Sequence, residues 1–225
     1  MYKLPLLFLI LTFTSQAQTT YTFDHVLEYE FQKHQDSLVQ KCYILTNSKE
    51  NYFAEVSEIN EETYNFNLVD RGKGIAAHLK VEKPNFFTSE IFEIPCYYAH
   101  RHRNMYKFRN RHFEFVQNPD TLYFNEEQEF YTLKSVKPKR EKRRKLGRMH
   151  FVIQPGTGYH FPVLTSTIAF NEWEKEKSLP NGIPSIFYHT NFKNETLNIH
   201  RLLKIYKVKK YIRLEEGCNP GVRRV

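Results

Sequence analysis

The sequence contains three cysteines, one tryptophan and, after its first 13 residues, no long apolar run. Three cysteines allow at most one internal disulfide bond. Without a second long apolar run, no membrane helix is expected in the rest of the chain. The G-x-S-x-G and H-E-x-x-H motifs of common hydrolases are missing, and "QPGTGYH" (154–160) lacks the Lys-Ser/Thr end of a phosphate-binding loop. We therefore expect no enzymatic activity and no cofactor.

The apolar run at the N-terminus has the features of a secretory signal peptide. It extends from Leu4 to Phe13, about half of the ~20 residues that a membrane-spanning helix needs. A short basic start precedes it, and the small residues Ser15 and Ala17 follow it two positions apart, as signal peptidase requires. We predict a signal peptide over residues 1–17 and a single domain over residues 18–225. This domain is expected to be exported to the bacterial periplasm, the envelope surface or the medium.

The chain is basic, with 33 Lys and Arg residues against 25 Asp and Glu residues and a formal net charge of +8. An exported basic protein seldom meets nucleic acid, and the sequence has no known nucleic-acid-binding motif. It does meet anionic lipid head groups and acidic cell-surface polymers. The expected partners are therefore a lipid or an anionic envelope polymer, and no nucleic acid is expected.

The basic residues are most concentrated in "KPKREKRRKLGR", residues 137–148, which holds eight basic residues and one acid. A segment this charged does not suit the centre of a sheet, so we predict a projecting loop or a long hairpin tip. Near an anionic surface each lysine or arginine contributes roughly 1 kcal/mol to binding. The predicted surface-binding residues are Lys137, Lys139, Arg140, Lys142, Arg143, Arg144, Lys145 and Arg148.

Aromatic residues dominate the composition, with 15 Tyr and 19 Phe. They alternate with polar residues at period two, which indicates half-buried antiparallel strands joined by short turns. We expect a mainly β fold, a curved antiparallel meander shaped as a half-barrel or open barrel with one short helix packed on it. The strands are expected at 21–31, 41–46, 51–58, 63–70, 75–82, 91–100, 104–108, 113–117, 122–124, 129–136, 149–153, 183–190 and 197–215, although 197–203 could instead be helical.

The one helix is predicted over "STIAFNEWEKEKS", residues 166–178. Phe170 and Trp173 lie three positions apart and therefore on one helical face. Pro180 ends the helix, because the residue before a proline disfavours helical backbone. We expect Trp173 to anchor the helix on the sheet.

Two of the three cysteines suit a disulfide bond in an oxidising compartment. Cys42 lies on the same strand face as Ile44 and is expected to be a small core residue. Cys218 lies in the tail "EEGCNPGV", which has little else to hold it. We favour a bond between Cys96 and Cys218 that pins the C-terminus to the sheet. Three free thiols are the alternative, since pairing cannot be deduced from spacing.

The segment "AHRHRNMYKFRNRH", residues 99–112, raises the question of a metal site. His100 and His102 lie on one strand face, and His112 is expected near them across a hairpin that turns at 109–112. The segment has no carboxylate or cysteine at ligand spacing, and its arginines oppose a cation, so we predict no metal site and a solvated basic rim. Other histidines are expected to be partners within the sheet: His25, His78 and His189.

The last 50 or so residues resemble a known class of protein. "SLPNGIPSIFYHTN", followed by a charged turn and "LNIHRLLKIYKVKKYI", is similar to the closing strands of exported bacterial half-barrel proteins. Two groups share this pattern, the lipoprotein carriers of the LolA type and the small secreted proteins named for a GLPGLI motif. The resemblance implies a signal peptide followed by a long antiparallel meander curled over a helix.

Two functions fit these features. A curved sheet lined with Phe and Tyr can enclose a pocket, which would make the protein a non-enzymatic, envelope-associated binding protein for an apolar or amphiphilic ligand. In the alternative, side chains fill the interior, and the protein is a structural or interaction module whose basic segment contacts anionic lipid or surface polymer. We favour the first function, and a Phe- and Tyr-lined pocket would distinguish it from the second.

Overall fold

The computed structural model describes residues 18–34, 37–104 and 112–220. The predicted signal peptide lies outside these residues, as do most of the strand predicted over 104–108 and most of the turn predicted over 109–112. In the described part of the chain, no helix is long and apolar enough to cross a membrane.

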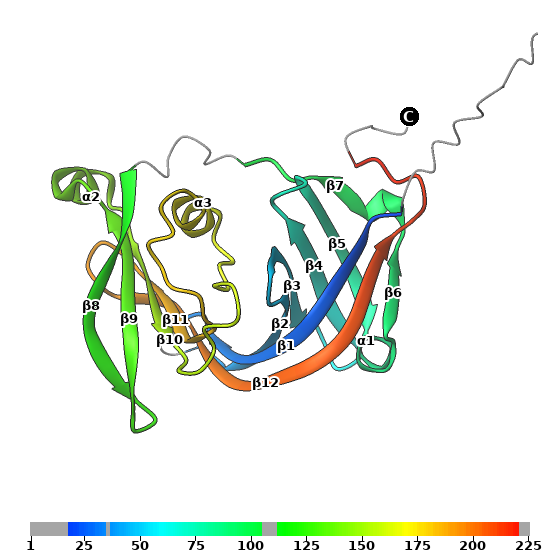
Figure 1. The fold of residues 1–225 in the computed structure, drawn as a ribbon, viewed down its shortest axis with the longest axis horizontal. Coiled ribbons are helices and arrows are strands. Elements are labelled where there is room, and N and C mark those ends of the chain that lie inside the picture. Colours follow the sequence, from blue (N-terminus) through cyan, green and yellow to red (C-terminus); the bar gives the residue numbers. More distant parts are fainter. Residues whose placement is uncertain (1–17, 35–36, 105–111, 221–225) are drawn as a thin grey trace, which may run out of the picture.

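One open sheet contains the twelve strands found in the described residues (Figure 1). The strands are β1 (Thr20–Gln32), β2 (Gln40–Asn47), β3 (Glu50–Glu58), β4 (Thr63–Asp70), β5 (Ile75–Glu82), β6 (Ile91–Ile94), β7 (Ala99–Arg101), β8 (Phe113–Tyr123), β9 (Glu126–Ser135), β10 (Arg148–Ile153), β11 (Pro184–Thr190) and β12 (Thr196–Leu214). Their order is β7-β5-β4-β3-β2-β1-β12-β11-β10-β9-β8. The described pairs are antiparallel except for β6, which runs parallel to β12. The predicted mainly β, antiparallel and open fold is confirmed.

Three helices accompany the sheet in the described ranges, together with a 3₁₀ turn, η1 (Cys96–Tyr98). They are α1 (Lys83–Thr88), α2 (Pro138–Arg144) and α3 (Thr167–Glu176). The predicted helix is confirmed as α3, but the expectation of a single helix was wrong. The basic segment is also not simply a loop, because Pro138 begins a helix of Lys, Arg and Glu, which are good helix formers. Likewise, Pro95 divides the strand predicted over 91–100 into β6 and β7.

The long strands β1 and β12 form the middle of the sheet and sweep along the bottom of Figure 1. Their pairing shifts register between Phe23 and His25 and again between Glu28 and Tyr29. Such bulges bend a strand and increase its twist, which helps to curve the sheet into a trough. Because β12 pairs with β1 along its length, residues 197–203 are strand and not helix.

Two clusters of buried side chains fill the two halves of the trough. The first packs α3 against strands on the β8–β11 side, with Trp173 and Phe187 among its members. The second joins β1–β5 to α1 and β6, with Phe66 and Phe86 among its members. The indole of Trp173 is 3% exposed, and its Nε1 donates a hydrogen bond of 3.1 Å to the carbonyl of Leu179. Trp173 therefore anchors α3, as expected.

Cys96 is bonded to Cys218 across 122 positions of sequence, which is the pairing favoured from the sequence. The amide of Cys96 donates to the carboxylate of Glu215 at 2.8 Å, and the amide of Glu215 donates to the carbonyl of Ile94 at 3.0 Å. The bond and these contacts hold the C-terminal tail against β6. Cys42 is a free thiol, half-buried against the first cluster.

Candidate functional site

Two hollows within the trough are small. The hollow beside Phe86 and Phe92 has a volume of about 10 Å³, and the hollow between His160 and Phe170 has a volume of about 20 Å³. A single water molecule needs roughly 10–15 Å³. Each hollow therefore has room for about one water molecule, and neither has room for an acyl chain.

An open hollow of about 760 Å³ lies between α2 and α3. Its described lining has no acidic residue and combines two kinds of side chain. The basic ones are Lys137, Arg140, Arg143 and Arg144, and the apolar ones are Phe113, Leu146 and Ile168. Guanidinium and ammonium groups bind phosphate and carboxylate, while the apolar side chains can contact hydrocarbon. The lining therefore suits a molecule with an anionic head and an apolar part.

A second open hollow, of about 500 Å³, borders the other face of α2. Residues 138, 141 and 142 line it, whereas residues 140, 143 and 144 line the first hollow. These two sets each follow the i, i+3, i+4 spacing of one helical face, so α2 separates the hollows. The second hollow is also lined by Lys134, Lys193 and Phe192, and by the acids Glu114 and Glu141. Basic side chains thus border both faces of α2, and the first hollow is the one without an acid in its described lining.

The eight basic residues predicted to bind an anionic surface fall into two environments. Two of them, Arg140 and Arg148, are half-buried. Arg148 is paired, with its Nη2 at 2.7 Å from Oε1 of Glu141. The other six are exposed: Lys137, Lys139, Lys142, Arg143, Arg144 and Lys145. We call the seven basic residues other than Arg148 the α2 surface.

The structure does not bring the three histidines of residues 99–112 together. His100 lies on β7, and the amide of His102 donates to the carbonyl of Gly74 at 2.8 Å, beside β5. His112 precedes β8, which is at the opposite end of the strand order from β7. Arg101 and Arg103 are exposed, as expected for a solvated rim.

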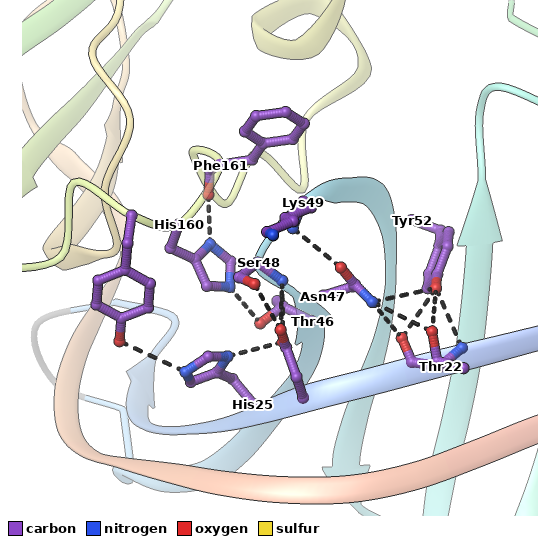
Figure 2. A network of polar contacts seen from close by, with 11 residues as sticks. Thr22, His25, Thr46, Asn47, Ser48, Lys49, Tyr52, His160 and Phe161 are labelled. Atoms are coloured by element: carbon purple, nitrogen blue, oxygen red, sulfur yellow. Dashed lines mark hydrogen bonds and ion pairs between the residues drawn. The ribbon is translucent and has the colours of Figure 1, made fainter.

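A different set of polar side chains meets where β1, the β2–β3 turn and the loop before α3 come together (Figure 2). The carboxylate of Asp24 accepts hydrogen bonds from Nδ1 of His25 at 2.7 Å and from the hydroxyl of Ser48 at 2.5 Å. Burial alone would raise the pKa of Asp24, but these bonds hold it below its ordinary value. Nε2 of His160 lies 2.8 Å from the hydroxyl of Thr46. Burial lowers the pKa of His160, so its ring is neutral at pH 7.

This polar cluster has no counterpart among the sites predicted from the sequence. His25 was expected to be a partner within the sheet, and Thr46 does face it across β1 and β2. The contact with His160 joins residues more than a hundred positions apart, and no local spacing marks it. The adjacent pair Asp24-His25 is the one local signal, and the contact between its two side chains is visible only in the structure.

No family model matches the chain, and no curated protein matches its sequence. Several solved structures are similar in fold. The Pseudomonas aeruginosa MucA/MucB complex matches 81% of this chain and 51% of that chain, with 5% identity and a TM-score of 0.40. A putative outer membrane lipoprotein-sorting protein domain from Vibrio parahaemolyticus matches 82% and 85%, with 7% identity and a TM-score of 0.32.

A DUF1329 family protein from Desulfovibrio piger matches 86% of both chains, with 9% identity and a TM-score of 0.30. The present chain spans about half the length of the matched chain in the MucA/MucB complex. A lipoprotein-sorting domain is thus among the matched structures. At these identities the likeness concerns the fold and not the function.

Proposed function

We propose that the protein is an exported, non-enzymatic binding protein that docks on an anionic lipid surface. The α2 surface would contact the anionic head groups of this lipid surface. The observation that carries this proposal is the open hollow of about 760 Å³ that four basic and three apolar side chains line together. A basic segment that only keeps the protein in solution does not require apolar side chains in the same hollow. A site for a purely apolar ligand does not require four basic side chains.

The amount of charge supports docking on a lipid surface. The α2 surface has seven basic residues, and Glu141, the one acid within residues 137–148, is paired with Arg148. At roughly 1 kcal/mol for each lysine or arginine near an anionic membrane, several kcal/mol are available at low ionic strength. Salt screens such exposed charges, so docking is expected to weaken steeply as ionic strength rises.

Neither of the two small hollows found in the described part of the trough supports a ligand held there. Hollows of about 10 and 20 Å³ do not accommodate a hydrocarbon chain. We therefore place the amphiphile at α2, and of the two functions considered from the sequence we favour the module that contacts anionic lipid.

A vesicle sedimentation assay tests the proposal. The protein should sediment with phosphatidylglycerol-containing vesicles at low salt and should stay in solution with pure phosphatidylcholine. Replacing Lys137, Arg140, Arg143 and Arg144 with Gln should reduce the bound fraction at least tenfold. The matched control removes four exposed positive charges elsewhere, by changing Lys80, Lys204, Lys207 and Lys209 to Gln.

The control separates a specific surface from total charge. If both quadruple variants lose binding equally, net charge and not the α2 surface is responsible. If the wild-type protein ignores anionic vesicles at low salt, the proposed function is wrong.

A further inference from the structure

An acidic side chain lies beside an imidazole where the pairing of β1 with β12 is irregular. Neighbouring residues of a regular strand point to opposite faces of the sheet. Between the pairs formed by Phe23 and His25, β1 has one residue, Asp24, whereas β12 has two, so the extra residue of this bulge is on β12. Oδ1 of Asp24 lies 2.7 Å from Nδ1 of His25. Bulges are frequent next to functional sites.

His160 approaches the same point from the loop before α3. Its Nδ1 lies 2.5 Å from the carbonyl oxygen of Phe161. A carbonyl oxygen only accepts hydrogen bonds, so Nδ1 has the proton. Nε2 therefore has the lone pair, and it accepts a hydrogen bond of 2.8 Å from the hydroxyl of Thr46. Metal-binding histidines are typically oriented in this way, with the second ring nitrogen donating to a carbonyl or carboxylate.

The three side chains offer a coherent set of donor atoms. One oxygen from Asp24 and one nitrogen each from His25 and His160 lie within 4.8 Å of one another. Zinc binds nitrogen and carboxylate oxygen at about 2.0–2.2 Å, which puts its ligand atoms roughly 3.3–3.5 Å apart. Small side-chain movements would therefore bring all three atoms to a common centre. Imidazole nitrogen also selects transition metals over Mg²⁺ and Ca²⁺.

The cluster is in contact with solvent and has a further oxygen atom beside it. The side chains of His25 and Asp24 are 6% and 41% exposed, so Asp24 connects the buried imidazoles to solvent. The hydroxyl of Thr46 lies 2.8 Å from Nε2 of His160, and an ion bound to Nε2 would replace this hydrogen bond.

We propose that Asp24, His25 and His160 form a binding site for a divalent transition-metal ion of the zinc type. The bound ion would tie the loop before α3 to β1 and would leave a fourth position for Thr46 or water. This site is separate from the α2 surface, and its test does not depend on lipid binding.

Zinc titration of the mature protein tests the site directly. The protein is stripped with EDTA, dialysed and titrated with Zn²⁺ in competition with a chromophoric chelator. We expect binding of one equivalent, with no competition from millimolar Mg²⁺. The variants Asp24→Asn and His160→Gln should each weaken this binding at least 100-fold. His189→Gln and Asp120→Asn, outside the cluster, are the matched controls and should bind like the wild type.

Thermal unfolding gives a second readout. At a Zn²⁺ concentration 100 times the dissociation constant, the Tm of the wild type should rise by about 5–10 °C. Asp24→Asn alters a partly exposed side chain, so this variant should fold even if His160→Gln does not. The Tm of the Asp24→Asn variant should not respond to Zn²⁺. Absence of binding at 100 μM Zn²⁺, on the order of a weak site, would overturn the proposal. Equal Zn²⁺ binding by the two cluster variants and the wild type would also overturn the proposal. The cluster would then only join the loop before α3 to β1 through hydrogen bonds.

Discussion

Glu141 and Arg148 form an ion pair that joins α2 to the first residue of β10. The carboxylate Oε1 of Glu141 lies 2.8 Å from Nε and 2.7 Å from Nη2 of the guanidinium. Glu141 is buried, although it lies in the most basic segment of the chain. The pair therefore positions α2 and, through it, the two hollows that border the helix.

This pair separates two explanations of vesicle binding. Glu141→Gln adds one positive charge to the α2 surface, so binding would strengthen if net charge alone mattered. We expect binding to weaken several-fold instead, because the loss of a charge partner loosens α2, and stability to fall by about 1–2 kcal/mol. Vesicle sedimentation and urea unfolding measure the two effects. Glu174→Gln, an exposed position on α3 with the same change in charge, should alter neither.

Period-two alternation predicted the strands well because one face of each strand is buried and the other is not. Helix α1 escaped prediction, since its six residues, Lys83–Thr88, are too few to show helical periodicity. The basic segment was not predicted as a helix because it has no apolar stripe at helical spacing. Such a stripe is missing because both faces of α2 border open hollows. Whether 197–203 was strand or helix depended on pairing with β1, a contact far away in sequence.

The two candidate sites differ in how much the sequence revealed. The α2 surface is contiguous in sequence, so its composition alone makes it a candidate. The polar cluster depends on the contact of Asp24 with His25 and on the meeting of both with His160, and neither follows from residue types at fixed spacing.

Acid should destabilise the protein through two neutral histidines. Burial lowers the pKa of His150 to about 4 and that of His200 to about 3. The unfolded chain binds a proton at each imidazole near pH 6.5, whereas the folded protein does not. The free energy of unfolding should therefore fall as pH falls below 6.5, by at most about 1.4 kcal/mol per pH unit for each histidine, until the folded pKa values are reached.

His200→Phe tests this slope at one position. The imidazole of His200 stacks on Phe187 with ring centroids 4.0 Å apart, and its buried Nδ1 has no hydrogen-bond partner among the described residues. The variant should gain about 1 kcal/mol at pH 7 and lose less stability at pH 5 than the wild type. Urea unfolding at several pH values measures both quantities. An unchanged slope, or the same change in the exposed control His78→Phe, would contradict the prediction.

Reduction of the disulfide bond should destabilise the whole domain. The bond between Cys96 and Cys218 closes a loop of more than a hundred residues, for which the chain-entropy model gives about 4–5 kcal/mol. The double variant Cys96→Ser, Cys218→Ser should unfold at lower urea concentration and should be insensitive to dithiothreitol. Cys42→Ala should keep the wild-type response to dithiothreitol, since Cys42 is a free thiol.

A single substitution at the tip of the β8–β9 hairpin should increase the stability of the protein. Phe124 and Asn125 have φ values of 51° and 62°, and the side chain of Phe124 is 74% exposed. A bulky residue is strained in this left-handed region, whereas Asn tolerates it. Phe124→Asn should therefore raise the free energy of unfolding by about 0.5–1 kcal/mol. Leu122→Asn, at a nearby exposed position without positive φ, removes a similar apolar surface and should give no such gain in urea unfolding.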